Sequence, residues 1–377
     1  MSTHILNNPF PSTAYNGPEY FCDREEETKS LLNNIKNGNS TTLVAIRRIG
    51  KTGLIQHVLG QLPKGWKGIY VDILDTEDLN NFLNHITSAI MNAVPEKSNI
   101  GIKFWDFIRS LRPIITFDSL TGEPQASFEF KGKETEKNIN SVLHFLENQE
   151  FKTVIAIDEF QQIVNYPEKN TDAWLRTRIQ QLHNVVFIFS GSQQHLMTEL
   201  FTSPKRPFFR STQMLKLEKI NKEKYCNFII TMFKKYQKEI DRDLTNEILE
   251  WSDNYTFYVQ QLFNRVFAAT KKNVTSEIWK QEASQLLKEQ ESLFLGYRNM
   301  LTISQWQLLK AIAHEGKVYM PTSKQFLSTY QLSTSASILR SLKTLCDIEL
   351  VYSEFDLQGE KYYSVYDVWF QRWSKLR

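Results

Sequence analysis

The chain has 377 residues, of which 41% are apolar and 23% charged, and its formal net charge is +3. This composition is ordinary for a globular protein of more than one domain and argues against a disordered chain. A charge of +3 is too small to indicate nucleic-acid binding by itself.

Neither the cysteines nor the apolar segments indicate a secreted or membrane protein. Cys22, Cys226 and Cys346 lie far apart and form no C-x-x-C pair, which is typical of reduced, buried thiols. No apolar run reaches the roughly 18 residues of a membrane span, and the N-terminus lacks a basic segment followed by an apolar one. We therefore expect a cytoplasmic protein with no membrane partner.

Strand-like and helix-like segments alternate over the first 218 residues. The first 20 are rich in Asn, Pro and Ser and predict an extended arm, and Asp23 is a candidate N-cap for the helix that follows. Short apolar runs predict buried strands at 42–46, 68–73, 153–157, 185–189 and 214–217. Helical periodicity lies between them at 52–62, 78–94, 134–148 and 172–183. This alternation predicts an α/β fold, a parallel sheet with helices on both faces.

One segment interrupts the alternation. Residues 112–132 predict two strands joined by the turn Thr121-Gly122-Glu123-Pro124, with Phe128 and Phe130 on one face of the second strand. Such a hairpin could cap an edge of the sheet or present an exposed surface to a partner. We expect the first arrangement.

The pattern changes after residue 218. Residues 219–292 show only helical periodicity and predict an all-α domain. Residues 293–377 predict three helices followed by two strands joined at 357–360, the element order of a winged helix-turn-helix. The predicted domains are therefore 1–218, 219–292 and 293–377.

A phosphate-binding loop is indicated where the first strand ends. Gly50-Lys51-Thr52 follows the apolar run and begins a helical pattern. Such a turn points backbone N–H groups inward, and the helix N-terminus adds partial positive charge. In a loop of this kind Lys51 reaches the β- and γ-phosphates and the Thr52 hydroxyl is a ligand of Mg²⁺. The full pattern has glycine where this chain has Ala45, and the tripeptide alone is a weak signal.

The other half of such a site follows the strand at 153–157. Asp158 presents a carboxylate to a magnesium ion at the carboxyl edge of the sheet, and Glu159 is placed to polarise a water for attack on the γ-phosphate. Alone, the pair could be a simple helix cap. Because both motifs occur in the expected order, we expect ATP or GTP binding with Mg²⁺.

Two further groups of polar residues are candidates at this site. Ser190 and Ser192 follow the strand at 185–189, where they could sense the γ-phosphate or orient water; a plain turn with an N-cap is the alternative. Arg206 and Arg210 precede the fifth strand, and an arginine there could neutralise charge on a γ-phosphate in its own subunit or a neighbour's. Arg210 is the stronger candidate, since Arg206 is as readily a solvated surface residue.

With these motifs placed, the chain resembles the AAA+ superfamily, and most of all the archaeal and bacterial ATPases grouped with the STAND class of signalling NTPases. The phosphate loop of that group, G-x-R-R-x-G-K-T, matches residues 45–52 except for the leading glycine. F-C-D-R-E-E-E at 21–27 resembles the family motif F-x-x-R-E-x-E, which flanks the adenine pocket. The nucleotide-binding residues that the resemblance implies are Phe21, Arg24, Arg47, Arg48, Ile49, Gly50, Lys51, Thr52 and Gly53.

Later segments match the family or depart from it at single positions. V-I-A-I-D-E-F at 154–160 matches its Asp-Glu strand, and F-S-G-S at 189–192 matches its Gly-Ser element. The residue before Arg210 is usually glycine and is Phe209 here. Asn254 and Thr256 replace the Gly and Pro of a turn in the lid, and Val368 replaces a proline near the C-terminus. The resemblance implies an ATPase domain, a helical lid and a winged helix.

Together these features predict an ATPase that uses ATP and Mg²⁺ and turns over slowly. Ala45 is tolerable in the loop if its φ is negative. The expected roles are catalytic for Lys51, Glu159 and Arg210, metal-binding for Thr52 and Asp158, and sensing for Ser190 and Ser192.

Three hypotheses about the whole chain follow. The leading one is a nucleotide-dependent conformational switch that gates assembly, as a homo-oligomer or with a protein partner. The second is a DNA-binding regulator or loader, although residues 301–377 carry nine Lys or Arg against seven Asp or Glu, and the expected recognition segment offers only Arg340 and Lys343. The third is an interaction protein that binds nucleotide without useful hydrolysis.

Overall fold

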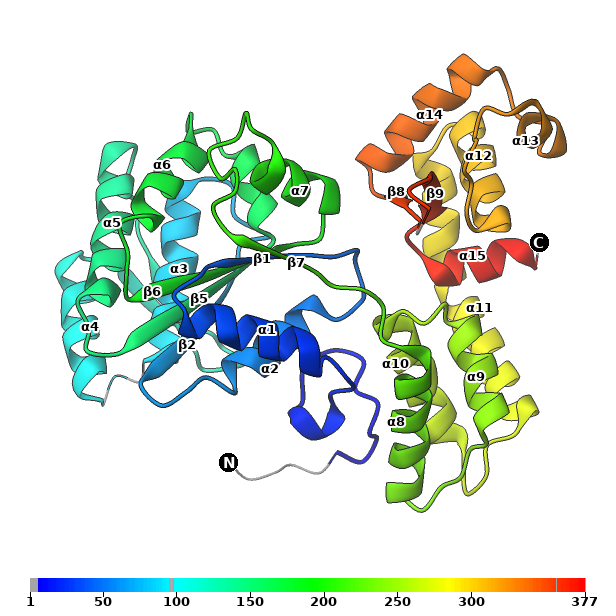
Figure 1. The fold of residues 1–377 in the computed structure, drawn as a ribbon, viewed down its shortest axis with the longest axis horizontal. Coiled ribbons are helices and arrows are strands. Elements are labelled where there is room, and N and C mark those ends of the chain that lie inside the picture. The colour runs from blue at the N-terminus through cyan, green and yellow to red at the C-terminus, as the bar shows by residue number, and fades with distance from the viewer. Residues whose placement is uncertain (1–5, 95, 97, 357, 377) are drawn as a thin grey trace. The chain divides into compact units, whose positions relative to one another are not determined.

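The computed structural model describes residues 6–94, 96, 98–356 and 358–376. Residues 13–219 form one unit, and residues 6–12 pack with 220–376 in a second (Figure 1). Leu357, in the expected turn of the winged helix, and residues 1–5 of the expected arm lie outside the described residues.

A five-stranded parallel sheet forms the centre of the first unit, in the order β2-β5-β6-β1-β7. Its strands are β1 (Thr41–Val44), β2 (Trp66–Asp72), β5 (Lys152–Asp158), β6 (Val185–Gly191) and β7 (Gln213–Lys216). The predicted α/β fold is confirmed, and each predicted strand lies within two residues of the observed one. β5 and β6 are buried along almost their whole length, which explains their unbroken apolar sequence.

Helices cover both faces of this sheet, with α1 and α2 on one side and α3, α5 and α6 on the other (Figure 1). The helices of this unit are α1 (Glu25–Lys36), α2 (Lys51–Leu59), α3 (Leu79–Ala93), α4 (Asn99–Ser110), α5 (Lys133–Glu147), α6 (Thr171–Ile179) and α7 (Gln194–Thr202), with short 3₁₀ helices at Pro18–Tyr20 and Phe160–Asn165. α4 was not predicted. The expected N-cap at Asp23 was wrong, because Asp23 and Arg24 both have left-handed backbones and α1 begins after them.

The hairpin of β3 (Ile114–Phe117) and β4 (Pro124–Ser127) forms a separate sheet. It packs on α3 instead of capping an edge of the main sheet. Ser88 Oγ, Asn84 Oδ1 and Asn80 Oδ1 accept hydrogen bonds from the backbone N–H groups of Ala126, Phe128 and Phe130 at 2.9, 2.9 and 3.1 Å. The acceptors are every fourth residue of the helix and the donors are every second residue of the extended segment. Four helical residues rise about 6.0 Å and two extended residues about 6.6 Å, so the spacing of the acceptors matches that of the donors.

Four helices begin the second unit: α8 (Lys222–Lys235), α9 (Arg242–Trp251), α10 (Thr256–Ala269) and α11 (Ser276–Met300). The N-terminal segment is not simply an extended arm, because it is anchored on these helices. The Phe10 ring is fully buried, 5.5 Å from the ring of Phe233 and 5.6 Å from that of Phe263. Asn8 and Asn264 each donate a side-chain hydrogen bond of 2.8 Å to the backbone of the other segment.

The predicted winged-helix elements follow: α12 (Ile303–Glu315), α13 (Lys324–Thr329), α14 (Ser335–Asp347), β8 (Val351–Phe355) and β9 (Lys361–Val365). A further helix, α15 (Val368–Lys375), was not predicted and joins this domain to the helices before it. Trp369 Nε1 donates to Gln261 Oε1 at 2.6 Å, and its ring lies 4.8 Å from that of Tyr258. The Tyr258 hydroxyl donates to Asp367 Oδ1 at 3.3 Å. These contacts join the lid and the winged helix within one compact unit.

Among the described residues, none of the helices is both long enough and apolar enough to cross a membrane.

Candidate nucleotide-binding site

The loop between β1 and α2 has the backbone of a phosphate-binding turn. Gly50 caps α2 with φ 93°, and Arg48 also has positive φ, at 69°. Lys51 begins the helix and is buried, with 8% of its surface exposed. The first N–H groups of α2, which have no partner within the helix, therefore lie beside a lysine, which is the arrangement that binds phosphate.

Ala45 does not occupy a position that needs glycine. It is 1% exposed and, unlike Arg48 and Gly50, has no positive φ. A phosphate-binding loop tolerates alanine at position 45 if the residue has a negative φ, and the structure meets this requirement.

We predict that Ala45→Gly changes ATP affinity and turnover by less than about threefold, because the left-handed positions of the loop lie elsewhere. Gly50→Ala is the matched comparison and is expected to weaken binding strongly, since alanine is strained at φ 93°. Titration with a fluorescent ATP analogue measures both. A large gain in turnover for Ala45→Gly would contradict this account of the loop.

Four donors converge on the carboxylate of Asp158, which is 3% exposed at the end of β5. Thr52 Oγ1 donates to Asp158 Oδ2 at 2.8 Å and the Tyr70 hydroxyl to the same oxygen at 3.0 Å. Ser190 Oγ and the backbone N–H of Glu159 donate to Oδ1. Burial and the neighbouring Asp158 charge raise the pKa of Tyr70, so its hydroxyl keeps the proton that it donates.

Glu159 is held by a second set of donors. Its Oε2 accepts hydrogen bonds from Ser192 Oγ at 2.7 Å, from Ser192 N at 3.1 Å and from Gln161 Nε2 at 2.6 Å. The backbone of Glu159 is left-handed, with φ 57°, a conformation that costs of order 1–3 kcal/mol and often marks functional residues. A Cβ at Gly191 would lie 2.0 Å from Gln161 Oε1 and 2.8 Å from Met197 Sδ, so a larger residue here would displace the Gln161 side chain that donates to Glu159. The two serines thus contact the Asp-Glu pair directly.

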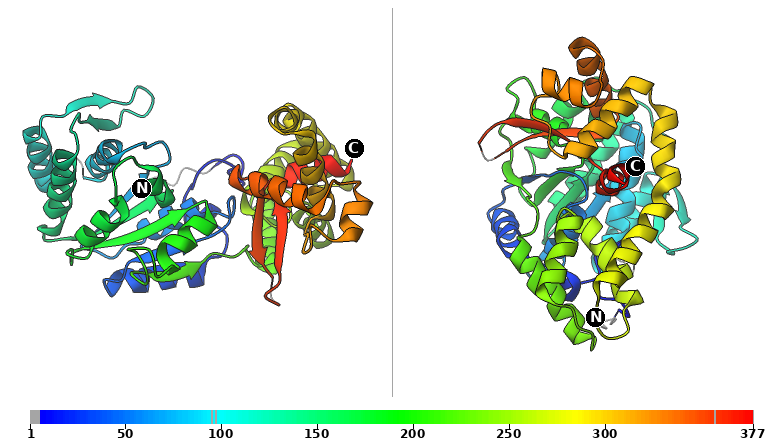
Figure 2. Two further views of the ribbon diagram at one scale, coloured as in Figure 1. Left: turned by 90° about the horizontal axis from the view of Figure 1, so that it is seen from above. Right: turned by 90° about the vertical axis from the view of Figure 1, so that its right-hand side faces the viewer.

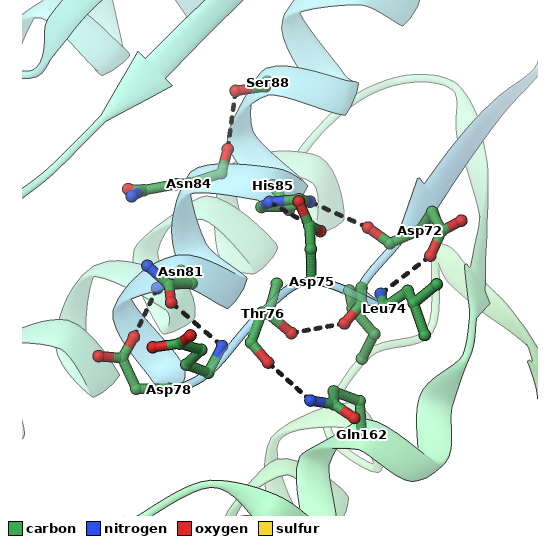
Figure 3. A network of polar contacts seen from close by, with 12 residues as sticks. Asp72, Leu74, Asp75, Thr76, Asp78, Asn81, Asn84, His85, Ser88 and Gln162 are labelled. Atoms are coloured by element: carbon green, nitrogen blue, oxygen red, sulfur yellow. Dashed lines mark hydrogen bonds and ion pairs between the residues drawn. The ribbon is translucent and has the colours of Figure 1, made fainter. Parts of the chain in front are cut away.

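The end of β2 places a third carboxylate, that of Asp72, beside this pair. Figure 3 shows Asp72 with the polar residues that follow it in the chain. Asp72 is the register partner of Asp158, and its Oδ1 accepts from Leu74 N at 2.9 Å. His85 Nδ1 lies 2.9 Å from the Asp72 carbonyl oxygen, and its Nε2 lies 3.5 Å from Asp75 Oδ1. Burial raises the pKa of Asp72, opposed by the Leu74 bond, and the charges of Asp158 and Glu159 raise it further.

An aromatic group lies against the first turns of α2. The rings of Phe21 and His57 stack with centroids 4.1 Å apart, and the Tyr15 hydroxyl lies 2.9 Å from His57 Nδ1. Burial lowers the pKa of His57, which favours the neutral ring. Arg24, 3% exposed, donates to the Ile49 carbonyl at 3.3 Å and to Glu27 Oε1 at 2.8 Å. Arg24 therefore stabilises the backbone of the loop at Ile49.

Arg210 lies at the opposite edge of the sheet in its own chain. It precedes β7, whose amino end is aligned with that of β1, whereas Lys51 follows the carboxyl end of β1. Arg210 and Arg176 line a cavity of about 280 Å³ that has no carboxylate in its wall. Arg206 is paired with Glu199 at 2.7 Å and approaches Asp172 at 3.9 Å.

The donor set fits a nucleotide-bound magnesium ion. Thr52 Oγ1 and Asp158 Oδ2 are hard oxygen ligands 2.8 Å apart, next to the buried Lys51. No cluster of three or more His, Cys, Asp or Glu suited to a metal occurs within the described ranges. Mg²⁺ is commonly bound by one or two protein oxygens, with phosphate and water completing its octahedron, so this sparse site suits it.

These features define a P-loop ATPase of the AAA+ type: a parallel sheet, a phosphate loop after β1, an Asp-Glu pair after β5 and a C-terminal winged helix. Residues 21–262 match the family described as an ATPase domain predominantly from Archaea, and residues 292–376 match a probable winged helix domain. The chain belongs to this family of ATPases.

Solved structures with similar folds agree with the family, although their low identity shows the fold alone. A Walker-type ATPase of Pyrococcus abyssi is 17% identical with a TM-score of 0.67, covering 97% of this chain and 99% of that one. The ORC2 protein of Aeropyrum pernix, solved with ADPNP and ADP, is 12% identical with a TM-score of 0.60, covering 98% and 96%. The ORC1 protein of the same organism, solved with DNA, is 13% identical with a TM-score of 0.52, covering 98% and 96%. No functionally curated protein matches the chain.

The residues at the site that were not predicted include Tyr15, His57, Tyr70, Asp72 and Gln161. A signal existed for Tyr70, because a hydroxyl two residues before the end of a strand lies near the carboxyl edge where Asp158 was expected. Gln161 lies two residues after Glu159 but belongs to no motif. The stacking of His57 on Phe21 joins an early arm to a later helix, which spacing alone does not indicate.

Proposed function

We propose that this chain is a slowly hydrolysing, Mg²⁺-dependent ATPase whose nucleotide state sets the conformation of the chain. The observation that carries the proposal is the hydrogen bond from Thr52 to Asp158 beside a buried Lys51, with Glu159 next in sequence. It joins the start of α2 to the end of β5 in the geometry that nucleotide-bound magnesium requires. Placement with the STAND class remains a prediction, based on Arg47 and Arg48.

Each residue then has a definite task. Lys51 and the N–H groups of residues 47–53 bind the phosphates, and Thr52 with Asp158 would hold Mg²⁺, which supplies charge neutralisation on the phosphates when bound. Glu159 accepts a proton from the attacking water. Ser192 and Gln161 hold Oε2 of Glu159, and we assign the other carboxylate oxygen, Oε1, to the attacking water.

Tyr70 is proposed as a positioning residue for Asp158. Tyr70→Phe removes one of two hydroxyl donors to Asp158 Oδ2, and loss of such an outer contact typically costs 10- to 100-fold in metal affinity. We expect the Mg²⁺ concentration for half-maximal turnover to rise about tenfold while ATP binding without metal is unchanged. Tyr319→Phe, in the other unit, is the control. If turnover depends on Mg²⁺ concentration in the same way in Tyr70→Phe and the wild type, Tyr70 does not position Asp158 for the metal.

Arg210 is proposed to act on the nucleotide of a neighbouring copy. It precedes β7 at the amino edge of the sheet, so it does not share an edge with Lys51 of its own chain. An arginine supplied in trans is an established way of stabilising charge on a transferring phosphoryl group. The chain would then work as a homo-oligomer in which ATP at one copy is completed by the next.

A protein is the partner that we propose for the winged helix. On α14, Arg340 and Lys343 are exposed, but so is 55% of Leu339, and Phe355 in β8 is 64% exposed. Apolar side chains of this size are typical of protein interfaces. DNA is the second candidate, favoured by the fold of the DNA-bound ORC1 protein. Measuring the affinity for duplex DNA across a salt series distinguishes the two candidates, because a chain with no affinity even at low salt does not have DNA as its partner.

The proposal is tested by ATP turnover in wild type, Lys51→Ala and Glu159→Gln. The wild type is expected to turn over ATP faster than either variant. Equal, background-level rates in all three would remove hydrolysis from the proposal and leave an interaction protein that binds nucleotide. The choice of ATP as substrate rests on the family match, so turnover of GTP is measured in the same assay.

A further inference from the structure

The two edges of the β3–β4 hairpin differ in how their backbone groups are used. The outer edge of β4 is occupied, because α3 side chains accept its N–H groups and Asn80 Nδ2 also donates to the Phe128 carbonyl at 2.6 Å. On the other side, β3 pairs with β4 alone within the described part of the chain. One edge is therefore protected and the other is not.

The register identifies which backbone groups of β3 point outward. Asp118 N donates to Glu123 O at 2.8 Å, so residues of β3 that are even in number exchange bonds with β4. Ile115 and Phe117 then direct their N–H and C=O groups away from β4, and Pro113 offers a carbonyl. No hydrogen bond to those outward groups occurs among the described residues. This is the template on which a further strand can add.

Apolar side chains accompany this open edge. Ile114 is 61% exposed, Phe117 64% and Leu120, in the turn, 94%. The hairpin projects from the helices near it, as the turquoise strands at the top of the left view of Figure 2 show. Natural proteins usually block such an edge with an inward charge, a bulge or a covering element, and within β3 itself every residue is uncharged.

We propose that β3 is a self-association edge, on which β3 of a second copy of this chain adds as an antiparallel strand with Ile115 opposite Ile115. This pairing is self-complementary. The pairing itself ends at Pro113, because Arg112 has a left-handed backbone with φ 56°. Arg112 and Asp118 flank the strand at opposite ends and carry opposite charges, so each end of the antiparallel pair brings an Arg112 of one copy toward an Asp118 of the other. Hydrogen bonds from Thr121 N and Leu120 N lower the pKa of Asp118, which favours its charged form.

The backbone chemistry agrees with this register. The outward groups of Ile115 bond those of its symmetry mate, and Phe117 N–H donates to the Pro113 carbonyl of the second copy. Pro113 lacks an N–H, which costs nothing where only its carbonyl is used. Ile114 then lies opposite Thr116, a pair of β-branched residues at the close spacing of a non-hydrogen-bonded position. This association does not depend on nucleotide and does not rest on the proposed ATPase cycle.

Disulfide crosslinking tests the register in the full-length chain. Ile114→Cys and Thr116→Cys are made separately in a Cys346→Ser background, since Cys22 and Cys226 are buried and Cys346 is partly exposed. Opposed residues at this position have Cα atoms about 4.5 Å apart, within disulfide range. A mixture of the two variants is expected to crosslink at least tenfold faster than either alone. Equal rates, or strong crosslinking of Thr116→Cys alone, would overturn the proposed register.

A charge placed on the edge tests whether the association exists. Ile114→Lys is expected to raise the dimer dissociation constant at least tenfold, while Ser127→Lys, on the neighbouring strand β4, changes it little. Light scattering is run without nucleotide, in wild-type and Lys51→Ala chains, so that assembly driven by ATP is separated from pairing of the hairpins. Thermal melting confirms that each variant is folded. A wild-type chain that stays monomeric across the dilution series, or a dimer insensitive to Ile114→Lys, would overturn the proposal.

Discussion

Lys51→Ala is expected to abolish measurable ATP binding at concentrations that saturate the wild type. Lys51 is buried at the start of α2, in the loop that we propose as the phosphate site. Removing one partner of a buried charge pair costs about 2–5 kcal/mol, which corresponds to a rise in Kd of roughly 30- to several-thousand-fold. Isothermal titration with ATP and Mg²⁺ measures the loss directly.

The control for this variant is Lys36→Ala, an exposed lysine at the end of α1 in the same unit. It removes the same kind of side chain from an exposed position outside the loop, and the variant is expected to bind ATP as the wild type does. Binding by Lys51→Ala within threefold of the control would mean that the phosphates are bound elsewhere. Unfolding temperatures of both variants exclude loss of structure as the cause.

Glu159→Gln is expected to bind ATP normally and to lower turnover about 100- to 10,000-fold, the range that a general base contributes. The amide cannot accept a proton from the attacking water. It keeps the shape of the side chain, so its amide oxygen can still accept the hydrogen bonds from Ser192 and Gln161. Phosphate release under saturating ATP gives the rate.

Glu150→Gln, at an exposed position before β5, makes the same chemical change away from the site and is expected to leave turnover intact. If Glu159→Gln retains more than about a tenth of wild-type turnover, Glu159 is not the base. Asp72 is the next carboxylate to consider in that case, because it is the register partner of Asp158 and its raised pKa favours proton uptake.

Sequence alone predicted the residues that the strand order brings together. Lys51, Asp158 and Ser190 each follow or end a strand, and parallel strands put all such positions at one edge of the sheet. The hydrogen bonds from Thr52 and Ser190 to Asp158 are therefore a consequence of topology. Their predicted roles with nucleotide stay predictions.

The contacts that could not be predicted from the sequence are formed by side chains that extend from one helix or strand to another. Tyr70 meets Asp158 only because β2 and β5 pair in one particular register. The ladder of Asn80, Asn84 and Ser88 has helical spacing, but a polar face on a helix is usually taken as solvated. Its partner backbone lies about 40 residues later, at Ala126 and beyond, so no local pattern joins the two.

One measurement tests the central claim most directly: the fate of radiolabelled ATP bound to excess protein with Mg²⁺, followed after rapid gel filtration. We predict that wild type converts the bound ATP to ADP over time, that Glu159→Gln retains ATP unchanged, and that Lys51→Ala retains no nucleotide. Wild-type protein that holds ATP without converting it, as Glu159→Gln does, would contradict the hydrolytic site built from Lys51, Thr52, Asp158 and Glu159.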